Sequence, residues 1–299
     1  MTTNNQFIGE FAALGAAFLW AASSIVYAFL GQKIPPLQLN LLKGIVATFL
    51  IILTLLLTHN SLPTLTPLPV IILLISGAIG IGLGDTAYFT TLNYLGARRT
   101  LLMETLATPM SAMFAFIFLS ETLSLQSCLG IILTLLGVAW VITERTTESV
   151  INHSHPIRGI LWGILAAFSQ ATGVVLARFA LVNSNLSSLE STLLRLIGGM
   201  IIIGILLLIP RNQKANQPLK LSLRLIGIIS LAAFGSTYLG IWLQQTSLKF
   251  APAGIAQTLL ATSPLFVLPF ALAMGQKISL RAFLGVLVAL AGIGLLFTQ

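Results

Sequence analysis

Charge is what this sequence has least of. Only 7% of its 299 residues are Asp, Glu, Lys or Arg, whereas 57% are hydrophobic. A soluble domain carries about 25% charged residues, so an ordinary water-exposed surface is excluded. The net charge of +8 does not indicate nucleic-acid binding, because the basic residues are scattered singly over short loops. We expect the lipid bilayer to surround most of the chain.

Side chains that carry chemistry are also scarce. Cys128 is the single cysteine, which excludes an internal disulfide, and it lies in an apolar run where we expect it to pack. The three histidines have no cysteine or carboxylate at metal-ligand spacing, so neither a metal nor a cofactor is predicted. The phosphate-binding pattern Gly-x-x-x-x-Gly-Lys-Ser/Thr is missing, which argues against ATP as the direct energy source.

Long apolar runs dominate what is present. A spanning helix needs about 20 apolar residues. Ten candidate runs occur, at residues 7–29, 37–57, 68–92, 98–119, 126–142, 157–181, 187–209, 222–247, 252–273 and 280–297. Strands of a membrane barrel would alternate apolar and polar residues, whereas these runs are continuous. The sequence therefore predicts an all-α integral membrane protein with ten transmembrane helices.

The two halves of the chain resemble each other. The first span recurs 150 residues later, and from Asp85 onward an offset of 155 residues applies without a gap. The matches at this offset pair Pro109 with Pro264, Gly130 with Gly285, and Gly137 with Gly292. Prolines and glycines that recur in one register indicate a duplicated unit. We expect a first five-helix repeat at 1–145, a linker at 146–156 and a second repeat at 157–299.

The odd number of spans in each repeat has a consequence for topology. After five crossings the second repeat enters the membrane from the opposite side, so the repeats are inverted. Alternating-access transporters often have this arrangement, with the substrate site near the membrane midplane between the repeats. A duplicated receptor or scaffold is one alternative. A membrane-embedded enzyme is another, with Asp85 and Glu104 as the only paired candidates at membrane depth.

Several short motifs resemble the EamA-type ten-helix carriers of the drug/metabolite transporter superfamily. They are Phe18-Leu19-Trp20, Lys43 with Arg195, Gly84-Asp85, Leu95 to Arg99, Thr108-Pro109 and Leu119 to Ser124, with an echo at Met274 to Ser279. Gln276 departs from the family, in which glutamate is usual. The resemblance implies eight helices around a central cavity, with the fifth and tenth at the periphery. It also implies export of amino acids, other metabolites or drug-like compounds across a bacterial-type plasma (inner) membrane.

Charged residues inside the spans are the first candidates for function. These are Lys43, Asp85, Glu104, Arg178 and Arg195, and each needs a partner or a wet cavity. Asp85 and Glu104 are carboxylates that would couple export to a proton gradient. The alternative is that they form buried ion pairs with Lys43 or Arg195. These two bases occupy equivalent places in the repeats, which favours a structural or gating role for them.

Polar and aromatic groups complete the predicted cavity. Apolar walls with a few fixed polar groups are typical of small-molecule sites. Besides Asp85 and Glu104, the cavity candidates are Trp20, Ser23, Ser24, Tyr88, Gln170, Trp242, Gln245, Gln257 and Thr262. Interhelical hydrogen bonding, or a lipid-facing ring, is the alternative for each of them.

Proline and glycine predict bending and close packing. Pro109 and Pro264 are expected to kink or weaken equivalent helices, which suits a gating motion. The fifth and tenth spans each carry two glycines seven residues apart, Gly130 with Gly137 and Gly285 with Gly292. Small residues on one helix face allow close approach. We expect packing within the chain, with a homodimer contact as the alternative.

Basic residues are distributed unevenly between the two sides. The loops after odd-numbered spans carry eleven of them, namely Lys33, Arg98, Arg99, Arg145, Arg158, Arg211, Lys214, Lys220, Arg224, Lys277 and Arg281. The opposite loops carry only Lys249. The positive-inside rule then places both termini outside the cytoplasm, whereas the family resemblance more often places them inside.

Overall fold

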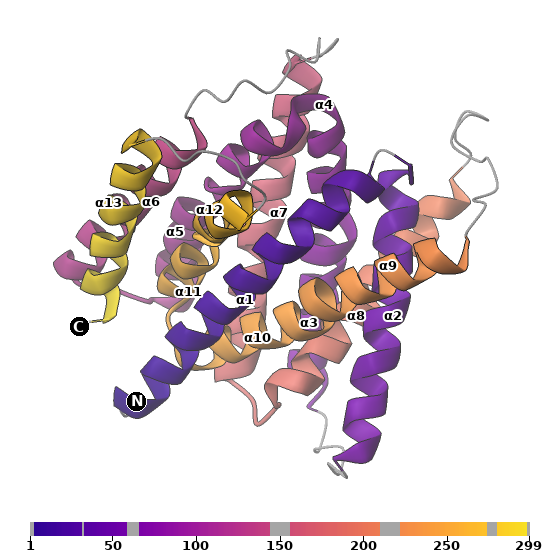
Figure 1. Cartoon of the computed structure of the whole chain (residues 1–299). Coiled ribbons are helices and arrows are strands. Elements are labelled where there is room, and N and C mark those ends of the chain that lie inside the picture. The colour runs from indigo at the N-terminus through magenta and orange to yellow at the C-terminus, as the bar shows by residue number, and fades with distance from the viewer. Residues whose placement is uncertain are drawn as a thin grey trace.

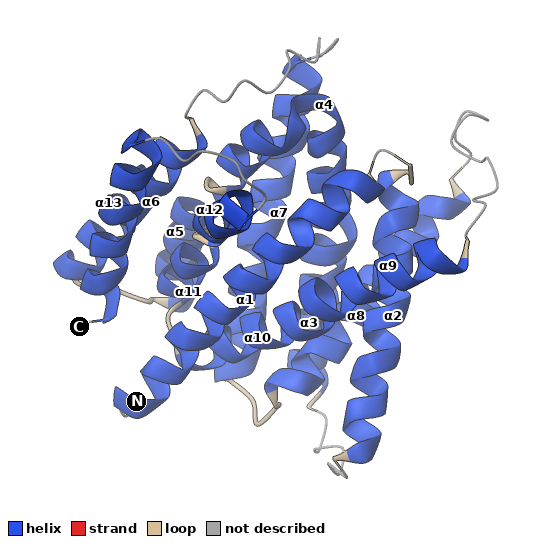
Figure 2. Cartoon of the chain, viewed as in Figure 1, coloured by secondary structure: helices blue, strands red, loops and turns tan. Residues whose placement is uncertain are grey.

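Helices form nearly all of the regular structure. The computed structural model describes residues 3–31, 33–58, 66–143, 156–209, 222–273 and 280–297, and no strand occurs among them (Figure 2). The first half contains α1 (Thr3–Leu30), α2 (Pro36–Leu57), α3 (Pro67–Gly77), the π-helical η1 (Ala78–Gly84), α4 (Asp85–Glu104), α5 (Ala107–Leu119) and α6 (Leu125–Ile142). The second half contains α7 (Pro156–Val182), α8 (Ser188–Leu208), α9 (Leu223–Ala233), the π-helical η3 (Phe234–Leu239), α10 (Gly240–Phe250), α11 (Ala253–Leu260), α12 (Ser263–Ala273) and α13 (Leu280–Phe297).

These elements amount to ten apolar spans. Seven are long and apolar enough to cross a membrane: Phe7–Tyr27, Pro36–Leu57, Pro67–Leu95, Thr100–Leu119, Ile157–Val182, Ser188–Leu208 and Leu223–Phe250. Three shorter apolar helices cover Leu125–Val141, Ala253–Val267 and Phe283–Phe297. Each half therefore has five spans, and the predicted all-α, ten-helix membrane fold is confirmed.

The gap between the third and fourth predicted runs, residues 93–97, lies inside α4 instead of forming a separate loop. Neighbours on α7 reveal the path of the chain: Gly84 lies beside Ser169, Leu95 beside Gly159, and Met103 beside Gly163. Up to Leu95 the chain runs antiparallel to α7, and by Met103 it runs parallel to it. The chain thus changes direction where the sequence predicts, although these residues are all assigned to α4.

The third span of each repeat contains a π-helical segment at an equivalent place. η1 begins at Ala78 and η3 at Phe234, within one residue of the 155-residue offset. Such segments are rare and frequently lie at functional sites. η1 packs against α7 and α8, whereas η3 packs against α1 and α2. Each π segment therefore contacts the first two spans of the other repeat, as inverted repeats require.

The fifth and tenth spans, α6 and α13, pack mainly against each other at one side of the molecule (Figure 1). A Cβ added to Gly137 would lie 2.4 Å from the backbone nitrogen of Ala289, and one added to Gly292 would lie 2.5 Å from that of Thr134. The two backbones approach so closely that only glycine fits. Packing within the chain is confirmed, and this glycine face is not free for a homodimer contact.

Both ends of the chain lie at the same end of the molecule (Figure 1). The ring of Phe297 contacts the rings of Phe7 and Phe11. We call this the terminal end. The opposite end contains the short connection between α1 and α2 and the reversal in α4.

Candidate functional site

A cavity of about 410 Å³ lies between the two repeats. Residues from all eight inner spans line it, and no described residue of α6 or α13 does. The volume lies within the range of about 300–1,000 Å³ that is usual for small-molecule sites. The observed arrangement is eight spans around a cavity, with the fifth and tenth at the periphery.

Most of the predicted candidates do line this cavity. They are Trp20, Ser23, Ser24, Asp85, Tyr88, Glu104, Gln170 and Gln257, together with Lys43, Arg195 and Pro264. These residues come from α1, α2, α4, α7, α8, α11 and α12. Segments separated by up to 244 positions in the sequence, from Trp20 to Pro264, therefore converge on one space.

Three other cavity candidates, Trp242, Gln245 and Thr262, are not among the residues that line this cavity. Trp242 lines a separate pocket of about 310 Å³ with Lys249 and residues at the ends of α2 and α8. Gln245 is fully buried and accepts a hydrogen bond from Ser191 Oγ at 2.8 Å. Thr262 is buried and donates to the Leu259 carbonyl at 2.6 Å.

The π segment η3 accounts for the difference between the face of α10 predicted to line the cavity and the face observed there. Trp242 and Gln245 were assigned to the cavity because they lie three residues apart on one helical face. The cavity is instead lined by Ile241 and Gln244, each one residue earlier. A π segment adds a residue to a helical turn, so a 3.6-residue period does not carry through it.

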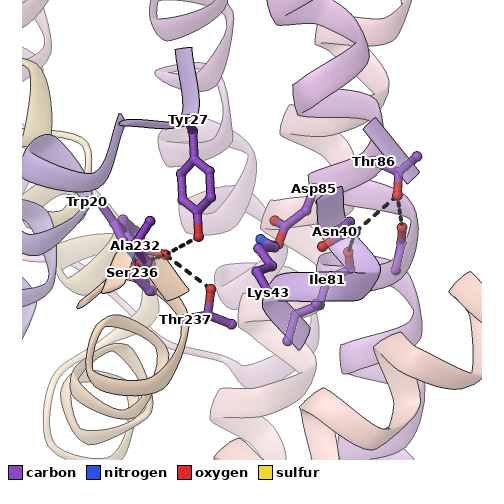
Figure 3. Close-up of polar contacts among 11 residues, drawn as sticks. Trp20, Tyr27, Asn40, Lys43, Ile81, Asp85, Thr86, Ala232, Ser236 and Thr237 are labelled. Atoms are coloured by element: carbon purple, nitrogen blue, oxygen red, sulfur yellow. Dashed lines mark hydrogen bonds and ion pairs between the residues drawn. The ribbon is translucent and has the colours of Figure 1, made fainter. Parts of the chain in front are cut away.

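An ion pair between Lys43 and Asp85 occupies the cavity wall (Figure 3). Lys43 Nζ lies 2.5 Å from Asp85 Oδ2, and the side chains are 8% and 29% exposed. Lys43 Nζ also lies 5.1 Å from the ring centre of Phe89, within cation–π range. For Asp85 the structure thus shows the ion pair that the sequence offered as an alternative. Glu104 makes no ion pair with any described residue.

Side chains donate hydrogen bonds to equivalent carbonyls of the two π segments (Figure 3). Asn40 Nδ2 donates to the Ile81 carbonyl at 2.9 Å. Trp20 Nε1 donates to the Ser236 carbonyl at 2.8 Å. Ile81 and Ser236 are 155 residues apart, so they occupy the same repeat position. These bonds fix α2 and α1 against the π segments and hold the Trp20 indole at the cavity.

A polar network that the sequence reading missed lines the cavity beside Trp20. Tyr27 Oη lies 2.8 Å from Ser236 Oγ, which donates to the Ala232 carbonyl and lies 3.1 Å from Thr237 Oγ1 (Figure 3). Tyr27, Ser236 and Thr237 all line the cavity, as do Thr105 and Gln244. The run Ser236-Thr237-Tyr238 within an apolar span was the available signal. The sequence around Tyr27 contains no such signal, because its hydrogen-bond partner lies 209 residues away.

A cluster of hydrogen bonds joins several segments at the terminal end. Arg178 Nε lies 2.7 Å from Glu121 Oε1, and Arg178 Nη1 donates to the carbonyls of Leu248 and Lys249. Glu121 Oε2 accepts from the backbone N–H of Ala253 at 2.9 Å. This Glu121–Arg178 cluster ties the α5–α6 connection to α7 and to the α10–α11 connection. Gly9 of α1 packs directly against Ala251 beside it.

The fourth and ninth spans are interrupted at matching positions. Helical structure breaks at Thr105–Leu106 and again at Ala261–Thr262, just before Pro109 and Pro264. Proline lacks the N–H of a helical hydrogen bond and clashes with the carbonyl four residues earlier, which accounts for both breaks. Pro264 lines the cavity, whereas Pro109 is exposed on the outer side.

Among the described residues, no group of three or more His, Cys, Asp or Glu side chains is placed to hold a metal ion. The site instead offers two bases, two carboxylates and aromatic rings around a space for a small molecule. Ten spans in two inverted repeats with such a cavity between them define a membrane transporter fold.

The comparisons identify the family. The model of the EamA-like transporter family matches residues 7–143 and 157–298, so the chain belongs to the EamA-like transporter family, with one match in each half. A solved structure titled "Crystal structure of protein" has a TM-score of 0.77 and 15% identity, and the match covers 99% of this chain and 96% of that one. It supports the fold alone. No curated protein matches the chain. Because members of the family are transporters, membership points away from an enzyme.

Proposed function

We propose that this protein is a secondary transporter that exports small organic metabolites, such as amino acids or drug-like compounds, by alternating access. The observation that supports this most is the cavity of about 410 Å³ between the repeats, which holds fixed charges of both signs. Such a site suits a small polar or zwitterionic molecule. The proposed location is the plasma (inner) membrane of a bacterial-type cell.

The two ends of the cavity support an alternating-access cycle. The Glu121–Arg178 cluster closes the terminal end. Cavity residues instead continue toward the opposite end through Ile25, Leu92 and Leu101. In the sequence, the loops that follow the odd-numbered spans carry most of the Lys and Arg residues. The positive-inside rule therefore assigns the end at which α1 finishes to the cytoplasm. In this proposed orientation, an opening at that end would load substrate from the cytoplasm.

Glu104 is the proposed site of energy coupling. It lines the cavity, and it has no ion-pair partner among the described residues. A carboxylate in a transport path is suited to bind either a proton or a cationic group of the substrate. Competition between the two would exchange one proton for one substrate molecule.

The test is flux through the purified protein in liposomes. Radiolabelled amino acids and a set of drug-like amines are loaded, and their release is followed with and without a pH gradient. We expect release of some of these compounds, accelerated when the acceptor side is acidic. The Glu104→Gln variant should keep exchange of labelled for unlabelled substrate but lose the response to the pH gradient.

Three outcomes would count against this proposal. Release no faster than from empty liposomes, for every compound, contradicts transport of these classes. Chemical conversion of a compound without movement across the membrane supports the enzyme alternative. Binding without movement or conversion supports the receptor or scaffold alternative.

A further inference from the structure

The two membrane-embedded bases stand in different surroundings, although they occupy equivalent repeat positions. Lys43 pairs with Asp85 and lies over the ring of Phe89. The positions that correspond to Asp85 and Phe89 at the 155-residue offset are Gly240 and Gln244. Arg195 corresponds to Lys43, and its Nη1 donates to Gln244 Oε1 at 3.1 Å. The second repeat thus keeps the base and lacks the acid.

Arg195 has no carboxylate of the described residues in direct contact. It is 1% exposed and makes no ion pair with a described residue. Asp85 and Glu104 line the same cavity, but neither forms an ion pair with Arg195, and Asp85 is already in contact with Lys43. No carboxylate in the described part of the chain therefore contacts the guanidinium. A buried charge without a partner is costly, so an anion bound beside Arg195 would stabilise it.

Two hydrogen-bond donors at this position also lack acceptors. Arg195 Nε and Gln244 Nε2 are buried and have no hydrogen-bond partner in the described part of the chain. Both side chains line the cavity, and Gln244 is 2% exposed. A guanidinium beside an amide N–H presents several donors to one acceptor group, and carboxylates match the guanidinium geometry well.

The surrounding backbone keeps this position free of an acid from the protein. A Cβ at Gly240 would lie 2.6 Å from Trp20 Nε1, so the indole occupies the space of the missing acid. A Cβ at Gly80 would lie 3.0 Å from Arg195 Nη2, so a glycine gives the guanidinium its room. Beside Arg195 and Gln244 the protein provides hydrogen-bond donors, a positive charge and space, but the described residues supply no acceptor for Arg195 Nε or Gln244 Nε2.

We propose that Arg195 and Gln244 form the subsite that binds the carboxylate, or a similar single anionic group, of the transported molecule. This inference rests on the proposed transport function and narrows its substrates to carboxylate-bearing metabolites. It gives Arg195 a substrate contact in place of a purely structural or gating role. Glu104, on a different span, is left for the cationic group of a zwitterion.

The test uses a near-isosteric change, Gln244→Glu, that supplies the missing acid from the protein itself. L-Leucine and L-phenylalanine are compared with their carboxamides and their decarboxylated amines as transport substrates in liposomes. We expect the wild type to move the acids at least about tenfold faster than the carboxamides, a preference of about 1.4 kcal/mol. The Gln244→Glu variant should lose this preference, because its own carboxylate occupies the Arg195 donors.

Gln257→Glu is the matched control. It adds the same charge to the same cavity from α11, and no hydrogen bond joins Gln257 to Arg195 among the described residues. The added charge is expected to change the flux of every compound, but the acid should remain faster than its carboxamide because the Arg195 donors stay free. Gln244→Glu should also melt no lower than the wild type, because it gives Arg195 an ion-pair partner, so loss of the preference would not result from unfolding.

Three outcomes would overturn the inference. Equal loss of the ratio in both variants would show a general effect of cavity charge. A wild type that moves the amines or carboxamides best would refute the anion subsite while leaving transport intact. If none of the compounds crosses the membrane, the proposed transport function fails for these compounds. Binding to the subsite is then tested separately: if neither acid raises the melting temperature of the solubilised protein, the subsite is refuted.

Discussion

The two repeats have matching backbones and different charges. Both contain a π segment in the third span and a break in the fourth. The acids Asp85, Glu104 and Glu121 all belong to the first repeat. Gly240, Leu259 and Gln276 stand at the corresponding positions of the second. The matched backbone supplies two equivalent arrangements for alternating access, and the unmatched charges make the arrangements unequal in energy and in ligand contacts.

The largest effect is expected from removing Asp85, the acid of the first repeat that has no counterpart in the second. Asp85→Asn leaves Lys43 buried without a counterion, which should cost about 3 kcal/mol of unfolding free energy, the lower end of the usual range because Asp85 is partly open to the cavity. Chemical unfolding in detergent measures it. The double variant Lys43→Met with Asp85→Asn should recover much of the loss. A single variant as stable as the wild type would mean that the pair carries no such energy.

The next effect concerns the seam where the last spans of the two repeats meet. Gly137→Val would drive a side chain into the backbone of Ala289, and overpacking of this kind costs about 1–3 kcal/mol. Gly294→Val on the same helix pair is the control, since a Cβ at Gly294 meets nothing within 4 Å. The melting temperature of Gly137→Val should be lower than that of Gly294→Val. Equal melting temperatures for both variants would contradict the close approach of α6 and α13.

A change at the terminal end is expected to shift the stability less. Its clearer effect should be on the access of a soluble reagent to the interior of the protein. Glu121→Gln weakens the charged hydrogen bonds to Arg178 and Ala253, worth about 1.5–3 kcal/mol to the closed arrangement. In a Cys128→Ser background, a cysteine introduced at the buried Ala256 should then react several-fold faster with a soluble maleimide.

The control for this access experiment lies at the same end of the molecule. Glu190→Gln changes the capping box of α8, which is not part of the Glu121–Arg178 cluster, and labelling should stay at the wild-type rate. Equal acceleration in both variants would indicate general loosening in place of gate opening.

The smallest effect on stability, but a large one on flux, is expected from the matched prolines. Replacing both Pro109 and Pro264 with Ala restores a helical N–H at each break, so the free energy of unfolding should stay within about 1 kcal/mol of the wild-type value or rise. Flux in liposomes should fall several-fold because the weak points that permit rocking are gone. Unchanged flux would refute the gating role of the breaks.

The predictable parts of the fold depend on properties of single segments, such as their hydrophobicity and hydrogen bonding. A backbone in lipid must satisfy its hydrogen bonds within each segment, so ten apolar runs predict ten helices. The recurrence of Pro109 and Gly130 at Pro264 and Gly285 predicts the repeat without reference to contacts. Candidates such as Trp20 and Gln170 were found because polar groups are rare in apolar spans.

The parts that were missed depend on contacts between distant segments. The choice of Gln244 over Gln245 for the cavity follows from a π segment that leaves no signal in apolar periodicity. The partners of Tyr27 and Arg178 lie 209 and 57 residues away, and nothing local specifies them. The pairing of Asp85 with Lys43, and the isolation of Glu104, likewise required the packed bundle.

The sequence by itself determined that this protein lies in a membrane, crosses it ten times and does so as a duplicated, inverted unit. Hydrophobicity and odd span number are properties of segments and suffice for that. Only the tertiary structure decided which charges neutralise each other and which remain facing the cavity. Coulomb energy depends on distance and burial, and these exist only once the two repeats have packed around their common space.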